Sequence, residues 1–299
     1  MNLKPLVSIG VPTYNRPLGL KRTLKCLVNQ TYTNIEIVVS DNCSTNSEVE
    51  EIVNEFLSDH RIKYFKQPVN KGAVVNFQFA LEKSTGEYFK FLADDDWVDY
   101  NYVESCLKFL FQNPEYSTAY GVGNLCTNDG NFFDFDTKLN LDDCNPATRL
   151  KKYYGGVRNN STYYGLFKRE LVIKNFSFAT TIALDWIVIA RIIFIGKGKL
   201  ITNTNSYISI DGISSEMDVL TASFNMPVFT RSYPDLTIAL NAFRDIFWGS
   251  DVYKKYPFFK RLNLAFKCFF IIYKKRSVGK QLKSGTKKFI KYQLGILKR

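Results

Sequence analysis

Three adjacent carboxylates, Asp94, Asp95 and Asp96, follow directly on the apolar run Tyr88–Leu92 and precede Trp97. Like charges this close repel one another, so such a cluster needs water or a cation to stabilise it. Carboxylate oxygens are the ligands of hard divalent ions such as Mg²⁺ and Mn²⁺. Carboxylates also cap helices, because negative groups favour the positive end of a helix. Taken alone, the triplet fits metal binding and helix capping equally well.

The strand before the triplet belongs to a regular alternation of strands and helices. Apolar runs suit strands buried on both faces, and apolar residues at helical spacing separate these runs. This order predicts an α/β fold with a mostly parallel sheet and helices on both faces. Strands are expected at Leu6–Val11, Ile35–Val39, Ile62–Phe65 and Tyr88–Leu92, and helices at Leu18–Asn29, Thr45–Leu57, Ala73–Leu81 and Trp97–Phe111.

The rhythm changes after about residue 116, and the later elements are less regular. Ser117–Cys126 and Ser161–Phe167 are expected as strands and Leu184–Ile195 as a helix, whereas residues 200–230 show a mixed pattern. From Pro227 the pattern is helical to the end. We therefore expect one domain over residues 1–230, with halves 1–116 and 117–230, and a helical extension over 231–299.

Polar residues follow each of the first four expected strands. They are Pro12, Thr13, Tyr14 and Asn15, then Asp41 and Asn42, then Asn70, Lys71 and Gly72, and finally the aspartate triplet. The carboxyl ends of parallel strands share one sheet edge, where α/β proteins bind ligands. Each motif also has a structural explanation, since Asp41 with Ser44 suits a turn and helix cap and Asn70–Gly72 suits a turn. Their recurrence at successive strand ends favours one common cleft.

The ordered set resembles the family-2 glycosyltransferases with the GT-A fold, of the type that builds bacterial polysaccharides and glycans. The resemblance runs from Val7 to about Lys199 and rests on Val11–Arg16, Asp41–Ser44, Asn70–Ala73 with Asn76, and Gly86–Trp97. It implies that Pro12, Thr13, Tyr14, Asn15, Asp41, Asn70, Gly72, Asp94 and Asp95 contact the donor nucleotide. It also implies Mn²⁺ or Mg²⁺ on Asp96 and Asp94. Ala93 stands where many relatives have the first aspartate, which leaves open which two carboxylates face the diphosphate.

The resemblance further implies a general base in the second half of the chain. Asp185, at the start of the helix that contains Arg191, matches the residue usually credited with this role. Leu184 replaces the glutamate that usually precedes it. From the residues alone, Asp185 would instead be a helix N-cap.

Charge is distributed unevenly along the chain. The net charge is +12, yet residues 252–299 hold 15 Lys and Arg and no acidic residue, which leaves 25 basic and 28 acidic groups elsewhere. This tail predicts an amphipathic basic helix, suited either to an anionic membrane surface or to packing on the domain with its lysines in water. Nucleic acid is not expected as a partner, because apolar residues dominate the other face of the tail.

Composition narrows the class of protein further. The six cysteines form no CxxC pair, and His60 is the sole histidine, which disfavours a zinc site, a disulfide framework and a Ser-His triad. Neither a signal peptide nor an apolar run long enough to cross a membrane is found, so a cytoplasmic protein, peripheral on the inner face of the plasma membrane, is expected.

The expected activity is inverting transfer of a sugar from a nucleotide-sugar donor to a glycan or glycolipid acceptor. A nucleotidyltransferase would also use aspartate-bound metal, but its usual Gly- and Lys/Arg-rich loop is absent from Pro12–Leu20. A non-catalytic nucleotide-sugar-binding subunit is the third class. It would bind the donor without turning it over.

Overall fold

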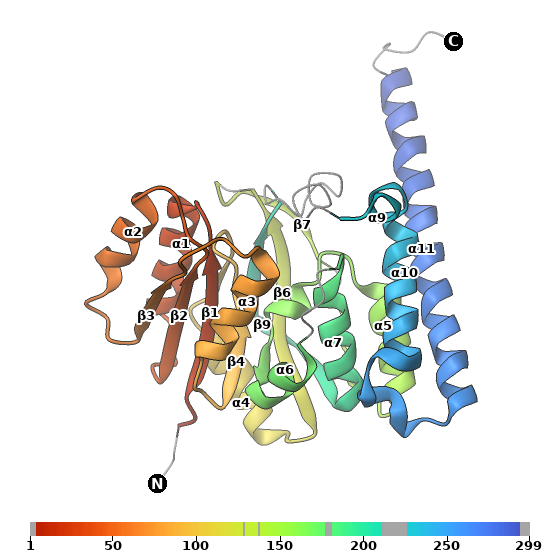
Figure 1. Cartoon of the computed structure of the whole chain (residues 1–299), viewed down its shortest axis with the longest axis horizontal. Coiled ribbons are helices and arrows are strands. Elements are labelled where there is room, and N and C mark those ends of the chain that lie inside the picture. Colours follow the sequence, from red (N-terminus) through yellow and green to blue (C-terminus); the bar gives the residue numbers. More distant parts are fainter. Residues whose placement is uncertain (1–3, 128, 137, 177–180, 211–225, 294–299) are drawn as a thin grey trace.

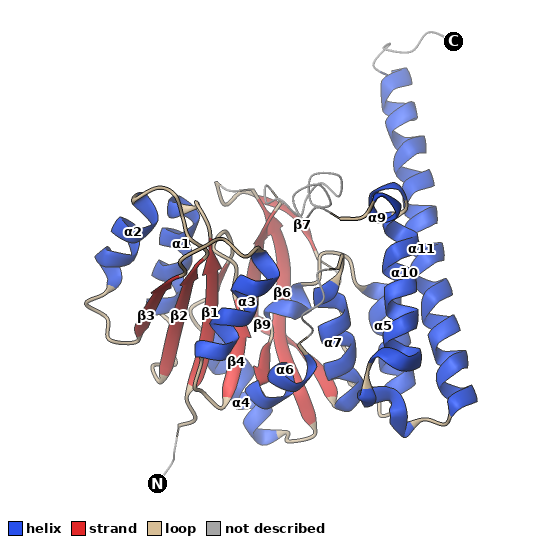
Figure 2. Ribbon diagram, in the orientation of Figure 1, coloured by secondary structure: helices blue, strands red, loops and turns tan. Residues whose placement is uncertain are grey.

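The computed structural model of the chain describes residues 4–127, 129–136, 138–176, 181–210 and 226–293, with side chains of the last helix described to residue 275. A single sheet crosses the molecule with helices on both sides (Figures 1 and 2). Its strand order is β3-β2-β1-β4-β8-β6-β9-β5, with β7 paired to β6. The strands are β1 (Val7–Thr13), β2 (Ile35–Asp41), β3 (Ile62–Lys66), β4 (Tyr88–Phe91), β5 (Trp97–Val98), β6 (Tyr116–Cys126), β7 (Phe132–Phe135), β8 (Leu166–Lys168) and β9 (Lys197–Ser209).

The sheet is parallel where the sequence predicts it to be. Strands β3, β2, β1 and β4 pair in parallel, and so do β6 and β9. The remaining pairs, β4 with β8, β5 with β9, and β6 with β7 and β8, are antiparallel and short. All residues of β1 and β2 are buried, which is consistent with the apolar residues that dominate both strands. The prediction of a mostly parallel α/β sheet is therefore confirmed.

Four helices cover the two faces of the parallel half. They are α1 (Pro17–Val28), α2 (Glu48–Phe56), α3 (Ala73–Lys83) and α4 (Tyr102–Gln112). Leu20, Leu24 and Leu27 of α1 pack in one core cluster with Val7 and Ile9 of β1. On the other face, α3 contacts β1 and β2, and its Leu81 joins a second cluster. Each helix buries its apolar stripe on the sheet, as the helical spacing predicts.

The expected helix over Trp97–Phe111 begins later than predicted. Trp97 and Val98 form β5, and the helix starts only at Tyr102. Asp99 accepts hydrogen bonds from Asn205 and Tyr207 of β9, and the ring of Trp97 stacks on that of Tyr207 at 5.2 Å. These partners lie more than a hundred residues away in the chain, so local pattern does not reveal them.

The expected strand over Ser161–Phe167 is also wrong in its first half. Ser161–Tyr164 form the 3₁₀ turn η1, and only Leu166–Lys168 form a strand. Asn160 has a left-handed φ of 56°, and the Ser161 amide donates to Asp136 at 2.8 Å. The turn is held by this distant carboxylate.

The second half of the chain packs helices beside the sheet. They are α5 (Pro146–Gly156), α6 (Arg169–Asn175), α7 (Leu184–Ile195), α9 (Val228–Ser232), α10 (Pro234–Arg244), the π-helix η3 (Asp245–Gly249), the 3₁₀ turn η4 (Asp251–Lys255) and α11 (Phe258–Gln293). Helix α7 has the predicted bounds. Much of the mixed segment 200–230 lies outside the described residues, and its start belongs to β9.

The first part of the last helix packs against the rest of the protein, and its C-terminal part projects away from it. Leu264, Ala265, Cys268 and Ile272 of α11 are buried in the second core cluster, and α11 runs beside α10. Its C-terminal part continues beyond the rest of the molecule (Figure 1). The predicted division of the chain at residues 230 and 231 stays a prediction.

Candidate functional site

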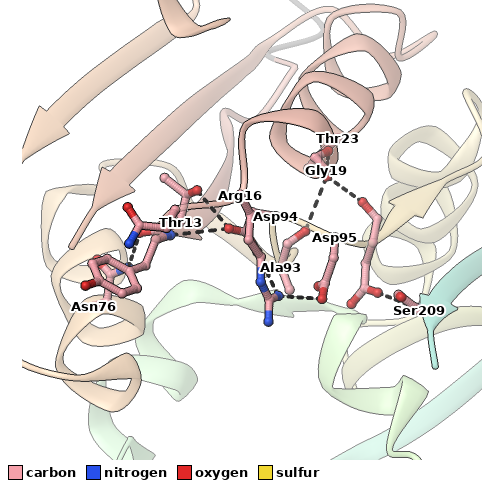
Figure 3. A network of polar contacts seen from close by, with 12 residues as sticks. Thr13, Arg16, Gly19, Thr23, Asn76, Ala93, Asp94, Asp95 and Ser209 are labelled. Atoms are coloured by element: carbon pink, nitrogen blue, oxygen red, sulfur yellow. Dashed lines mark hydrogen bonds and ion pairs between the residues drawn. The ribbon is translucent and has the colours of Figure 1, made fainter. Parts of the chain in front are cut away.

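The carboxyl ends of the parallel strands meet at one sheet edge. Thr13, the last residue of β1, stands in register with Asp41, the last residue of β2. Strand β4 ends at Phe91, three residues before Asp94, and the aspartates lie beside the loop that follows β1 (Figure 3). The sequence-predicted motifs of β1, β2 and β4 are thus brought together. Such an edge is where open α/β sheets bind ligands.

Asp94 is held by the end of β1. Its Oδ2 accepts hydrogen bonds from the Thr13 hydroxyl at 2.8 Å and from the Tyr14 amide at 3.3 Å. Its Oδ1 faces Arg16 Nη1 at 3.3 Å. Thr13 is buried, whereas Tyr14 is 39% exposed, so Tyr14 is free to contact a bound molecule.

Asp95 is the more open of the two carboxylates that Arg16 contacts. Arg16 Nη1 lies 2.5 Å from Asp95 Oδ2, and the Asp95 side chain is 16% exposed against 6% for Asp94. Arg22 of α1 donates to the Asp95 carbonyl oxygen at 2.6 Å and lies over the Trp97 ring. The backbone of the triplet is therefore fixed by α1 while the Asp95 side chain stays accessible.

Asp96 turns to the opposite side, toward β9. Its Oδ1 accepts the Ser209 amide at 2.8 Å, its carbonyl accepts the Thr23 hydroxyl at 2.7 Å, and the residue is buried. Burial and then the charge of Asp95 raise its pKa to about 8, although hydrogen bonds from the Ser209 amide and the Tyr164 hydroxyl act to lower it. Burial and Asp95 likewise raise the pKa of Asp94 to about 6, against the lowering effect of Arg16. Burial thus favours the neutral form of both carboxyl groups, and a cation placed beside them would favour the charged form.

Asp41 is the last residue of β2 and lies at the same sheet edge. It is fully buried, and its two oxygens accept from the Ser44 amide at 2.8 Å and the Tyr64 hydroxyl at 2.9 Å. The contact with Ser44 is the turn that the sequence suggested. Asn15 has φ 56°, and its side chain accepts from the Thr45 amide at 2.8 Å, which ties the loops after β1 and β2 together.

The loop after β3 has turn geometry. Asn70 accepts hydrogen bonds from Asn42 at 2.7 Å and from the Gly72 amide at 2.9 Å. Gly72 has φ +86°, a backbone conformation that residues other than glycine rarely adopt, and it precedes α3. Open space lies where a Cβ would stand at Gly72. Asn42 links this loop to the β2 end.

Asn76 is a buried residue whose side chain joins β1 to β2 and to the loop after β3. The family resemblance includes this residue but assigns it no role. Its Nδ2 donates to the Thr13 carbonyl at 3.2 Å, and its Oδ1 accepts from Ser40 and Gln67. Pro12, the residue before Thr13 in β1, is buried. Arg16 and Tyr64 were also given no role from the sequence, whereas Tyr164 begins a segment that resembles one near the acceptor cleft of the family. An arginine two residues after Tyr14 carries no local signal that it will reach carboxylates some eighty residues later.

Asp185 lies in the first turn of α7. The N-cap position of this helix belongs to Ala183, which has φ 58°, so Asp185 is not the N-cap. Burial raises the pKa of Asp185, whereas the hydrogen bond from Asn160 Nδ2 to Oδ2 at 2.5 Å lowers it, and the net change is upward. A half-buried carboxylate with a raised pKa suits proton transfer.

The η1 turn lies between the two acidic centres. Asn160, just before η1, contacts Asp185, and Tyr164, its last residue, contacts Asp96. Tyr153 donates to Asn160 at 2.9 Å from the core. Tyr153 and Tyr154 are buried, so they are core residues, whereas Tyr163 and Tyr164 remain partly exposed.

The carboxylates at this edge suit a divalent ion only in combination with other ligands. Within the residues that the structure describes, no group of three or more His, Cys, Asp or Glu side chains is arranged to hold a metal. Mg²⁺ in phosphate sites is bound by one or two carboxylates together with substrate phosphates. Asp94 and Asp95 supply that number of carboxylates, so the residues fit an ion shared with a phosphorylated ligand.

Comparison with known proteins identifies the family. The sequence model described as glycosyl transferase family 2 matches residues 8–176, more than half of the chain. The chain belongs to this family, as the resemblance implied. An uncharacterized glycosyltransferase of Haemophilus influenzae is 37% identical over 131 residues, which cover 44% of this chain and 52% of that protein. The GalNAc(5)-diNAcBac-PP-undecaprenol beta-1,3-glucosyltransferase of Campylobacter jejuni is 29% identical over 170 residues, covering 56% and 53%. The chain thus matches about half the length of these relatives.

Solved structures share the fold. S. aureus TarS 1–349 in complex with UDP-GlcNAc superposes with a TM-score of 0.58 at 16% identity, covering 90% of this chain and 81% of that one. Mannosyltransferase PcManGT from Pyrobaculum calidifontis, in complex with GDP-Man and Mn²⁺, gives 0.54 at 16%, covering 92% and 88%. The predicted GT-A fold is confirmed.

Proposed function

We propose that this chain transfers a sugar from a nucleotide-sugar donor to an acceptor hydroxyl. The observation that supports the proposal is the segment Asn160–Tyr164, which contacts Asp96 through Tyr164 and Asp185 through Asn160. We assign Asp96 to the donor side and Asp185 to the acceptor side, so this one short segment would link the two. We assign Tyr14 and Asp41, at the same sheet edge, to the donor nucleotide.

The transfer we propose inverts the configuration at the anomeric carbon of the donor sugar. The acceptor oxygen forms a bond to that carbon while the bond to the nucleoside diphosphate breaks, and the electron pair leaves with the diphosphate. Asp185 takes the acceptor proton. Positioned general-base catalysis contributes about 10² to 10⁴ in rate. Asn160 orients the Asp185 carboxylate and keeps it from a still higher pKa.

Mn²⁺ or Mg²⁺ is part of the proposal. Such an ion would balance charge on the departing diphosphate when bound. Asp94 and Asp96 were the ligands predicted from the sequence. We favour Asp95 together with Asp94, because Asp95 has the more exposed side chain and both carboxylates already face one cation, Arg16. Comparing Asp95→Asn with Asp96→Asn separates the two assignments: loss of Mn²⁺ binding in the first, with Mn²⁺ binding retained in the second, supports Asp95.

A glycan or glycolipid acceptor at the cytoplasmic face of a membrane is the proposed setting. Within the described residues, no helix is both long and apolar enough to span a bilayer. Helix α11 instead exposes Phe259, Phe266, Phe270 and Tyr273, on the face away from its buried residues. Lys260, Lys267 and Lys274 follow these aromatic side chains in the sequence. Exposed aromatics with basic neighbours suit an anionic lipid surface.

Liposome flotation tests the membrane setting. We expect full-length protein to float with vesicles that contain anionic lipid, and Phe259→Ser with Phe270→Ser to reduce this fraction several-fold. Phe111→Ser, which removes an exposed aromatic of α4, is the matched control. Equal partitioning of all three proteins would reject lipid binding by α11.

A donor panel tests the activity itself. We expect one nucleotide sugar to raise the melting temperature and to release nucleotide when Mn²⁺ or Mg²⁺ and an acceptor are present. Asp185→Asn should keep donor binding and lose transfer. Donor binding with no release in the wild type would favour a non-catalytic binding subunit. Release of pyrophosphate from a nucleoside triphosphate would favour a nucleotidyltransferase.

A further inference from the structure

Arg16 lies between the carboxylates of Asp94 and Asp95. One nitrogen, Nη1, lies 3.3 Å from Asp94 and 2.5 Å from Asp95 (Figure 3). An arginine guanidinium is always charged near neutral pH, so Arg16 brings a positive charge to the two carboxylates. The site therefore contains a cation of its own where a divalent ion would be shared with a donor.

The loop that carries Arg16 is anchored through the neighbouring residue, Asn15. Asn15 donates its amide to Ser44 at 2.9 Å and accepts from Thr45, which fixes the backbone next to Arg16. The Arg16 side chain is 32% exposed. Arginine has several rotatable bonds and a guanidinium that matches both carboxylate and phosphate, so on a fixed backbone it can pair with either anion within its reach.

Arg22 also lies near the aspartate triplet, but it contacts the backbone there, whereas Arg16 contacts the carboxylates. Arg22 donates to the Asp95 carbonyl oxygen and stacks on Trp97, so it holds the backbone. Within the described residues, the ion pairs of Asp94 and Asp95 are those with Arg16. A divalent ion placed on Asp95 would lie next to the Arg16 guanidinium, and the two positive charges would repel.

We propose that Arg16 is an internal counter-ion that a divalent metal must displace from Asp95, and that the displaced guanidinium then pairs with the diphosphate of the donor. The proposal rests on the proposed function, since it requires a nucleoside diphosphate donor. Metal alone must break the Arg16 ion pairs without replacing them. Metal with diphosphate offers Arg16 a new anion, and a guanidinium binds phosphate well.

This arrangement couples the two ligands. The diphosphate raises the affinity of the site for metal, and by linkage metal raises the affinity for diphosphate by the same factor. Arg16 is thus a positioning residue that prevents metal from occupying the site before the donor arrives. Coupling factors between sites are commonly about 5-fold to 150-fold.

Mn²⁺ binding by the full chain, measured from the free-ion resonance signal with and without UDP, tests the proposal. We expect wild type to bind Mn²⁺ about tenfold more tightly with UDP. Arg16→Gln should bind Mn²⁺ alone about tenfold more tightly than wild type and should lose most of the gain from UDP. Lys21→Gln is the matched control, because it removes one positive charge from α1 at a residue paired with Glu55. It should behave as wild type.

Arg16→Lys is a second variant, which keeps the positive charge but lacks the planar guanidinium group. It should bind Mn²⁺ alone as weakly as wild type. Unchanged or weaker binding of Mn²⁺ alone by Arg16→Gln would overturn the role of Arg16. If no protein binds Mn²⁺ under either condition, the counter-ion role falls together with the metal assignment. Calorimetry of UDP binding, and transfer with the matched donor, then report separately on the proposed function.

Discussion

The protonation of Asp185 depends on one neighbouring side chain. Burial raises its pKa, and the Asn160 amide opposes that rise by donating to the charged form. A general base works only when deprotonated, so its pKa sets the acid limb of the rate profile. Asn160 was not among the residues predicted for the site, because an asparagine before a tyrosine pair carries no catalytic signal.

Removing that amide should shift the acid limb. In Asn160→Ala the carboxylate loses the hydrogen bond that favours its charged form, so its pKa rises further and the rate falls on the acidic side. We expect the acid limb of kcat against pH to move upward, with recovery at high pH. Asn159→Ala, an exposed neighbour, should leave the profile unchanged. A rate reduced equally at every pH would indicate a purely structural role.

Buried Glu36 offers a test of stability at the residue scale. Burial would raise its pKa, but hydrogen bonds from Lys63, Ser8 and Thr85 outweigh this and lower it from 4.5 to about 2. A lowered folded-state pKa adds stability above the unfolded value, and this stability is lost as the pH falls through about 2. At pH 7 we expect Glu36→Gln to reduce the free energy of unfolding by up to about 3 kcal/mol.

Denaturant unfolding at two pH values checks this expectation. The difference between Glu36→Gln and wild type should be largest near pH 7 and should shrink below pH 4. Glu50→Gln, which breaks an exposed pair with Lys66, is the control and should cost less than about 1 kcal/mol. A deficit that stays constant down to pH 2.5 would contradict the assignment.

At the scale of elements, helix α1 supports the aspartate triplet through its backbone. A Cβ at Gly19 would lie 2.5 Å from the carbonyl oxygen of Asp94, so α1 touches the triplet there without a side chain between them. Arg22 and Thr23, one turn later, donate to the same segment. The carboxylates are therefore positioned by a helix, which is more precise than a free loop.

Gly19→Ala should disturb the donor site more than the helix. Alanine favours a helix by about 1 kcal/mol over glycine, but overpacking against backbone costs about 1 to 3 kcal/mol. We expect slightly lower stability, and UDP affinity reduced about tenfold because Asp94 moves. Leu18→Ala, at an exposed position of the same helix, should change neither. Wild-type UDP affinity in Gly19→Ala would show that the triplet tolerates the shift.

At the scale of the whole molecule, the structure of α11 bears on both interpretations of the basic tail, which were packing on the domain and binding to an anionic membrane. Its first half completes the core beside α10, and its later half stands clear of the fold (Figure 1). The prediction that lysines of a packed helix face water is met for the described part, although Lys275 donates to the Val157 carbonyl. Lipid binding by the exposed aromatic face remains a prediction.

Two truncations should therefore differ sharply. Removing residues 276–299 leaves the buried part of α11 in place, so we expect a melting temperature within a few degrees of wild type. Removing residues 258–299 takes away Leu264, Cys268 and Ile272, and each large apolar side chain buried contributes about 1.5 to 3 kcal/mol. That loss approaches the whole stability of a domain. Circular dichroism melts should show no cooperative transition for the longer deletion; an intact transition would contradict the core role.

Local sequence rules are enough to predict the parallel half of the sheet, the bounds of α7 and a common edge for the four strand-end motifs. Buried strands need apolar runs, and the carboxyl ends of parallel strands share one edge. Three other features appear only in the folded chain: Trp97 pairs with β9, Ser161–Tyr164 form a turn and not a strand, and Arg16 contacts Asp95. Each depends on a partner far away in the chain, and local pattern carries no record of a contact that forms only when the chain is folded.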